Sequence, residues 1–159
     1  MKYRILNEEE RKVFDEDFKA FLITNGVHAE EWAKMNETEV EKAVALVELF
    51  SDLVLDTVYQ KIEFIEFRST DSCLVFQCEK EQMNVISILP KNKEVVDLST
   101  PESIHKALQS EVDNLTVFRT SKAYSSPREM EIHRMIEQGC VASSKEFWEA
   151  LNSCLTPEK

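Results

Sequence analysis

Glycine is the residue that most constrains this chain, because only Gly26 and Gly139 occur in 159 residues. Glycine takes positive φ without strain, so tight turns that cradle phosphate or present a nucleophile usually depend on it. Two glycines so far apart exclude the motifs GxGxxG, GxxxxGK[ST] and GxSxG. The common catalytic scaffolds that a sequence reveals are therefore absent. We expect no cofactor, and a non-enzymatic protein is favoured over an enzyme.

Length and composition indicate a folded chain. Hydrophobic residues make up 43% of the sequence and charged residues 31%, and both values are typical of globular proteins. A chain of 159 residues is long enough to bury one core. We expect residues 1–159 to form a single globular domain. No apolar stretch is long enough for a membrane span and no signal peptide is evident, so we expect a cytoplasmic protein.

The net charge of −11 is distributed unevenly. Residues 1–62 carry 8 basic and 14 acidic side chains, residues 63–114 carry 5 and 10, and residues 115–159 carry 6 of each. Duplex nucleic acid and anionic membranes repel such a chain on average. The charge predicts a protein partner with a basic surface, and it places any anion-binding surface in the last third of the chain.

Helix starts are marked by capping patterns, in which Ser, Thr or Asn is followed three residues later by Glu. These pairs are Asn7/Glu10, Thr38/Glu41, Ser126/Glu129 and Ser143/Glu146. Thr100 followed by Pro101 predicts a fifth start. Left-handed glycine caps are expected at Asn25-Gly26 and at Gly139.

The N-terminal part is predicted to be helical. One helix is expected over Glu8–Thr24, a short one over Ala29–Met35, and a long one over Glu39–Ile62. The long helix has a first apolar stripe that includes Val47 and Phe50, and a second stripe of Leu46, Leu49 and Leu53. Such a wide arc needs cover on two sides. The helix is therefore either central to the fold or part of an interface between copies of the chain.

The middle and last parts predict a sheet followed by helices. Strands are expected over Glu63–Arg68, Ser72–Glu79, Met83–Leu89 and Leu115–Thr120, with a polar loop or weak strand at Lys91–Asp97. Short helices are expected over Pro101–Gln109, Pro127–Gln138 and Ser144–Leu155. The fold class is α+β: N-terminal helices including one long central helix, an antiparallel sheet of three to five strands, and short C-terminal helices.

Two clusters are candidates for cation sites. Glu48, Asp52 and Asp56 stand four residues apart on the long helix, so they either bind a cation or form a helix face that is solvated or paired with Arg68 or Lys61. Cys73 and Cys78 should face opposite sides of one strand, which argues against a shared metal. We expect no metal site and reduced thiols.

The segment from Arg119 to Arg128 is the best binding candidate. It combines cations, hydroxyls and an aromatic ring with a helix N-terminus, whose free N–H groups attract anions. The candidate binding residues are Arg119, Lys122, Tyr124, Ser126 and Arg128. The alternative is a strand-to-helix turn with an ordinary capping box.

Several fragments resemble a small bacterial family of unknown function. They are Glu31–Met35, Leu49–Asp52, Glu66–Arg68, and the block from Ser121–Tyr124 through Arg128-Glu129 to Ile136–Cys140. The resemblance implies no activity, cofactor or catalytic residue.

These observations favour a cytoplasmic protein-interaction module, such as an adaptor, a regulator or an immunity-type inhibitor, that engages a basic partner through its acidic N-terminal helices. The alternative is a small-anion or nucleotide-derivative binding module centred on residues 119–128, with or without catalysis. An RNA-associated factor using the same residues is a third hypothesis, which the net charge disfavours.

Overall fold

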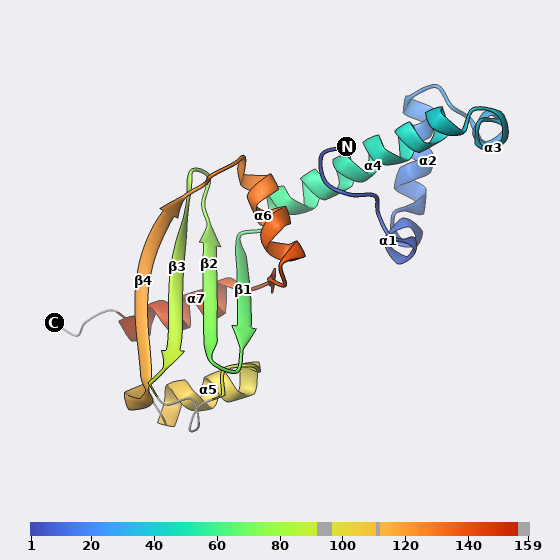
Figure 1. Cartoon of the computed structure of the whole chain (residues 1–159). Helices are drawn as coiled ribbons and strands as arrows, with labels where there is room; N and C mark the ends of the chain where they lie inside the picture. Colours follow the sequence, from blue (N-terminus) through green and yellow to red (C-terminus); the bar gives the residue numbers. More distant parts are fainter. Residues whose placement is uncertain (92–96, 111, 156–159) are drawn as a thin grey trace. The chain divides into compact units, whose positions relative to one another are not determined.

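The computed structural model describes residues 1–91, 97–110 and 112–155, and its elements form the expected α+β fold (Figure 1). The chain divides into two compact units, residues 1–59 and 60–159. The loop or weak strand predicted at Lys91–Asp97 lies largely outside the described residues, as do the side chains of Cys154 and Leu155.

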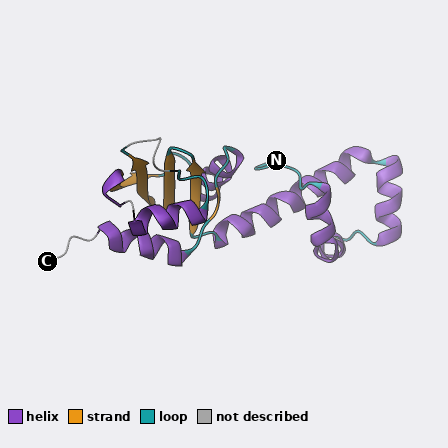
Figure 2. Ribbon diagram, turned by 90° about the horizontal axis from the view of Figure 1, so that it is seen from below, coloured by secondary structure: helices purple, strands orange, loops and turns teal. Residues whose placement is uncertain are grey.

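The first unit is built from helices (Figure 2). They are α1 (Glu8–Val13), α2 (Asp15–Thr24), α3 (Ala29–Thr38) and most of α4 (Val40–Lys61). The single helix predicted over Glu8–Thr24 was wrong, because the backbone leaves helical geometry at Phe14. The acidic run Asp15-Glu16-Asp17 that follows favours a new helix start, since carboxylates are stabilised near a helix N-terminus.

Of the three caps predicted in the first unit, two are confirmed and one was wrong. The capping box of Asn7 and Glu10 is confirmed, with both reciprocal hydrogen bonds at 2.9 Å. The Thr38/Glu41 box was wrong, because the Thr38 hydroxyl donates to the Lys34 carbonyl and closes α3 instead. The left-handed cap at Gly26 is confirmed by its φ of +79°.

Helix α4 buries one side of its apolar arc. Ala43, Phe50, Leu55 and Tyr59 are buried. The ring of Phe50 packs on Phe18 and Phe21, with ring centroids 5.0 Å and 5.3 Å apart. In the second predicted stripe, Leu49 and Leu53 are about half exposed. In the described part of the chain, the first side of the arc is therefore covered and the second side is not. An interface between copies of the chain through the second side stays a prediction.

The second unit is a five-stranded antiparallel sheet with the order β4-β3-β2-β1-β5. The strands are β1 (Phe64–Ser69), β2 (Ser72–Cys78), β3 (Gln82–Pro90), β4 (Leu115–Ala123) and β5 (Val141–Ala142). The meander β1-β2-β3 was predicted closely. Strand β4 runs three residues beyond its predicted end, and β5 was not predicted.

Helices α5 (Pro101–Ser110) and α7 (Lys145–Leu155) contribute to the core on one face of the sheet (Figure 2). Val75 and Ile86 from the strands pack there with Ile104, Trp148 and Leu151 from the helices. A 3-10 turn (Val112–Asn114) follows α5.

Helices α5 and α7 each begin after a residue whose side chain caps the helix N-terminus. Thr100 caps α5 as predicted, because its hydroxyl oxygen accepts the amide of Ser103 at 3.1 Å. Helix α7 is capped by Ser144 and not by the predicted Ser143, since the Ser144 hydroxyl oxygen accepts the amide of Phe147 at 3.1 Å.

Helix α6 (Arg128–Glu137) lies at the end of the sheet where β1 begins and β2 ends (Figure 1). Its C-cap residue Gln138 is followed, as predicted, by Gly139, whose φ of +112° is a left-handed conformation that favours glycine. A Cβ there would lie 3.5 Å from the Phe67 ring, so the space is adequate and backbone strain is the obstacle to substitution.

Candidate functional site

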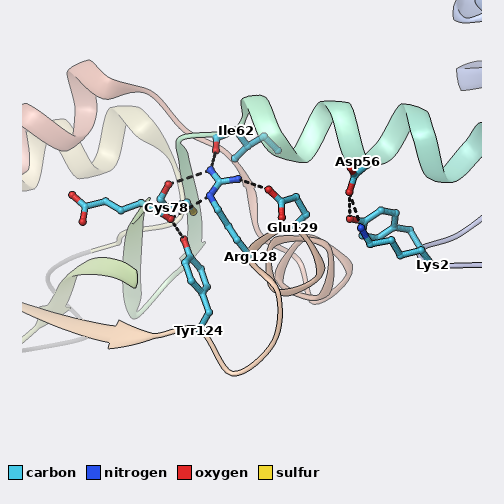
Figure 3. A network of polar contacts seen from close by, with 9 residues as sticks. Lys2, Asp56, Ile62, Cys78, Tyr124, Arg128 and Glu129 are labelled. Carbon is cyan, nitrogen blue, oxygen red and sulfur yellow. Dashed lines mark hydrogen bonds and ion pairs between the residues drawn. The ribbon is translucent and has the colours of Figure 1, made fainter. Parts of the chain in front are cut away.

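Two carboxylates of the acidic row of α4, Asp52 and Asp56, are bound by other residues of the chain. The carboxylate of Asp52 accepts the backbone amides of Lys2 at 2.7 Å and of Tyr3 at 2.9 Å. The carboxylate of Asp56 accepts the Tyr3 hydroxyl at 2.6 Å and pairs with Nζ of Lys2 at 2.9 Å (Figure 3). The ammonium group of Lys2 is therefore the cation that pairs with Asp56, in place of Arg68 or Lys61, and Glu48 is half-buried on the same helix.

These contacts change the acidity of both partners. The Tyr3 hydroxyl and then the Lys2 ammonium hold the pKa of Asp56 below its ordinary value. Burial, followed by the bond to Asp56, raises the pKa of Tyr3 to about 12. The Tyr3 ring also meets the Tyr59 ring edge-on at 5.1 Å. The segment that precedes α1 is thus attached to α4 by polar and aromatic contacts.

Residues 1–59 carry a dense negative surface. They contain 7 basic and 14 acidic side chains, a net charge of −7. Ten of the fourteen acidic residues are exposed. They are Glu8, Glu9, Asp15, Glu16, Asp17, Glu30, Glu31, Glu37, Glu39 and Glu41. Few of these carboxylates are neutralised locally, since the ion pairs that reach them come from Lys12, Lys19 and Lys42 in the described residues.

An aromatic hollow of about 310 Å³ opens within the same unit. Phe18, Trp32 and Phe50 form its walls, and Phe18 meets Trp32 edge-on at 5.2 Å. Asp15 and Arg11 stand at its polar side. Sequence reasoning missed this hollow, because Phe18 and Trp32 read equally well as ordinary core residues. The one signal in the sequence that could have indicated the hollow is that aromatic residues are frequent in these short helices.

The segment 119–128 begins on β4 and not in a turn. Arg119 donates from Nη1 to the side-chain oxygen of Asn152 on α7. Nζ of Lys122 lies 3.3 Å from Oε1 of Glu131 on α6. Ser126 accepts a hydrogen bond from Arg134 at 3.2 Å. Three of the five candidate residues therefore have partners on the C-terminal helices.

Glu131 takes the position that was predicted for an external anion. Its Oε2 accepts the backbone amides of Ser125 at 2.8 Å and Ser126 at 3.2 Å. Glu131 is 6% exposed. Burial alone would raise its pKa, but the bonds from Ser125, Lys122 and Ser126 lower the pKa below its ordinary value. The predicted Ser126/Glu129 capping box was wrong: Pro127 is the N-cap residue and makes no side-chain cap, and Glu131 reaches back to the loop.

Arg128 binds backbone carbonyls at the end of the sheet. Its Nη2 donates to the carbonyl of Cys78 at 3.1 Å and to that of Ile62, and its Nε donates to the carbonyl of Glu79 at 3.2 Å (Figure 3). Tyr124 donates its hydroxyl to the same Glu79 carbonyl at 2.5 Å, and burial is the main reason that its pKa rises to about 12. These contacts stabilise a cation at a helix N-terminus, a position that is otherwise unfavourable.

All five candidate residues thus have contacts within the chain that join β4 and α6 to neighbouring elements. Binding of an external anion by them stays a prediction. Among the described residues, no group of three or more His, Cys, Asp or Glu side chains is placed to hold a metal ion. Cys73, Cys78 and Cys140 are buried and free.

A comparison with models of protein families identifies the family of this chain. The model of a family of unknown function, DUF6495, matches residues 1–156. The chain belongs to this family. The resemblance read from fragments such as Glu31–Met35 is thereby confirmed at the level of an uncharacterised family. A search of curated proteins and a search of solved structures each give no match for this DUF6495 chain. No described helix is both long and apolar enough to span a bilayer.

Proposed function

We propose that this DUF6495 protein is a non-enzymatic interaction module whose N-terminal unit, residues 1–59, docks onto a basic protein surface. The observation that carries the proposal is the concentration of ten exposed carboxylates in a unit with a net charge of −7. Such a surface attracts a cationic partner over a distance and speeds association. An adaptor, a regulator and an immunity-type inhibitor all use this chemistry.

The aromatic hollow supports the same reading. Charge alone gives weak and unselective binding, whereas an apolar side chain inserted into a hollow adds most of the energy of an interface. Phe18, Trp32 and Phe50 supply apolar walls for such a side chain, and Asp15 beside them supplies a carboxylate. The partner segment best suited to this surface is basic and carries one bulky apolar residue.

The small-anion alternative at residues 119–128 has weaker support. Its best anion position, the amides of Ser125 and Ser126, is bonded to the carboxylate of Glu131. Its strongest cation, Arg128, is bonded to three backbone carbonyls. A phosphorylated ligand would have to displace these internal contacts.

The test is affinity capture from cells that naturally carry the protein, with two variants of equal net charge. One variant replaces Glu30, Glu31 and Glu37 with Gln in the first unit; the control replaces Glu81, Glu102 and Glu146, which are exposed in the second unit. We expect a captured basic protein whose binding weakens at high salt, is reduced by the first variant, and is retained by the control.

Two results would contradict the proposal. Equal loss of the partner with both variants would mean that net charge and not the first unit attracts it. A partner whose binding is unchanged by salt, or whose contact surface is acidic, would exclude docking driven by these carboxylates.

A further inference from the structure

A buried ion pair lies on the helix-covered face of the sheet. Glu66 and Arg68 are two residues apart on β1, so both side chains point to the same face. Their strand partners on β2, Val75 and Cys73, belong to the core on that face. The side chain of Glu66 is 4% exposed, and its Oε2 pairs with Nε of Arg68. A charge pair so deep in a small unit is costly unless it has good geometry and further partners.

The pair forms one side of a cleft of about 300 Å³ whose other residues come from α5, from α7 and from Ser144, which caps α7. The ring of Phe147 lies against the guanidinium of Arg68, 5.6 Å from its centroid. Leu108 and Ala150 add apolar surface, and His105 and Ser144 are the polar residues among them. The cleft therefore combines a charged pair with a mainly apolar wall.

Part of the hydrogen-bonding capacity of the pair is unused by the protein. Oε2 of Glu66 and Nε of Arg68 are the buried atoms, and they face each other. Within the described part of the chain, no hydrogen bond reaches Oε1 of Glu66 or the two outer nitrogens of Arg68. Glu66 thus fixes the guanidinium through Nε, and the cleft retains one carboxylate oxygen as an acceptor and two nitrogens as parallel donors.

We propose that this cleft binds a small carboxylate that carries an N–H donor on the neighbouring carbon and an apolar side chain, which is the chemistry of an apolar α-amino acid. The outer nitrogens of Arg68 match the two oxygens of a carboxylate. Oε1 of Glu66 accepts from the ammonium group, and Phe147, Leu108 and Ala150 contact the side chain. A zwitterion balances the opposite charges of the pair. This site is in the second unit and is independent of the acidic surface of residues 1–59.

The test compares three probes that differ by one group each: L-leucine, 4-methylpentanoate without the ammonium group, and isoamylamine without the carboxylate. Binding to the wild-type protein is followed by NMR of labelled alanine and leucine methyl groups. We expect L-leucine to shift the methyl resonances of Ala150 and Leu108, and each truncated probe to bind at least about tenfold more weakly, as expected for the loss of a charge-assisted hydrogen bond.

Two variants locate the binding. Ala150→Phe should fill the cleft without altering the ion pair and abolish the shifts, because Ala150 is exposed at the cleft. Arg68→Lys keeps the positive charge but removes the parallel donors. If the variant folds, its affinity for L-leucine should therefore fall by about tenfold. Glu81→Gln, exposed on the loop before β3, is the control and should bind as the wild type does.

The proposal is overturned if 10 mM L-leucine, a concentration of roughly the order that detects very weak ligands, leaves the Ala150 and Leu108 resonances unmoved. Undiminished binding by Ala150→Phe would also overturn it. Equal affinity for L-leucine and 4-methylpentanoate would exclude the role given to Glu66. None of these outcomes depends on whether Arg68→Lys folds.

Discussion

At the scale of single residues, the structure explains charges that the sequence left unpaired. Asp52 and Asp56 are isolated carboxylates in the sequence, and their partners Lys2 and Tyr3 are about fifty positions away. Periodicity finds neighbours along one helix, so it could not find these partners. The same reason explains why Arg128 was identified as a candidate binding residue while its carbonyl partners were not.

Tyr3→Phe tests the attachment of the N-terminal segment. The change removes the 2.6 Å bond to Asp56 and keeps the ring that packs on Tyr59. We expect a loss of about 1–2 kcal/mol in the free energy of unfolding at neutral pH, measured by urea denaturation. The pKa of Asp56 should rise toward its ordinary value of 3.8.

The sign of the pH dependence follows from the lowered pKa of folded Asp56. Its stabilising contribution is present above the unfolded value of 3.8 and is lost as pH falls through the lower folded pKa. The difference in the free energy of unfolding between Tyr3→Phe and the wild type should therefore become smaller as pH falls through this acidic range. Glu10, which pairs with Arg4 at 2.7 Å, should keep its lowered pKa and serves as the control. Unchanged titration of Asp56 in the variant would contradict the assignment.

Thiol reactivity gives a second prediction at this scale. Burial raises the pKa of Cys73 to about 12 and that of Cys78 to about 11, and it also raises the pKa of Cys140. Because the thiolate is the reactive form, these three thiols should react with Ellman's reagent far more slowly in the native protein than in denaturant. A titration in denaturant without reductant should find four thiols. Two or fewer would contradict reduced cysteines, and fast native reaction would contradict the burial.

At the scale of elements, most helices and strands were predictable, whereas the break at Phe14 and the two-residue strand β5 were not. The strands of the meander and helix α4 each agree with their predicted ranges within a residue or two at either end. Strand β5 has only two residues, too few to form an alternating pattern, and it exists because β1 has a free edge beside Ile65 and Glu66. The capping box at Asn7 was correct, whereas the box at Ser126 failed because Glu131 reaches back to the loop from further along the helix.

Two glutamates distinguish the predicted cap of α6 from the observed one. Glu131→Gln removes a buried carboxylate that accepts the amides of Ser125 and Ser126 and pairs with Lys122. We expect it to lower the free energy of unfolding by about 1–3 kcal/mol. The predicted box depended on Glu129, so Glu129→Gln is the matched control; it weakens only a 3.5 Å ion pair with Arg128 and should cost under about 1 kcal/mol. If chemical denaturation showed that Glu129→Gln destabilises the protein more than Glu131→Gln does, the predicted capping box of Ser126 and Glu129 would be supported instead.

At the scale of the whole molecule, the sequence located the excess of acidic residues but not the division into two units. The boundary between residues 59 and 60 falls inside the continuous helix α4 and carries no change in composition. The candidate site was only partly predictable for a related reason. The cations of residues 119–128 stand out in the sequence, whereas the oxygen atoms that bind them belong to α6, α7, β2 and the loops at Ile62 and Glu79.

The single-domain expectation can be tested with the two tryptophans, since Trp32 lies in the first unit and Trp148 in the second. Trp148→Phe leaves fluorescence that reports on residues 1–59, and Trp32→Phe leaves fluorescence that reports on residues 60–159. We expect denaturation midpoints that coincide with the circular dichroism midpoint of the same variant. Two separate transitions within either variant would mean that the units unfold independently.

The position of β4 has a consequence for the behaviour of the protein in concentrated solution. In the sheet order β4 stands at an edge, and its residues from Phe118 to Ala123 are exposed. An exposed edge strand is a template on which strands of other molecules can add, which is the first step of aggregation. Arg119 and Lys122 occupy this edge, and an incoming strand would have to desolvate both cations. The residues that looked most suited to recruiting a ligand are thus also placed where natural proteins put gatekeepers against unwanted self-assembly.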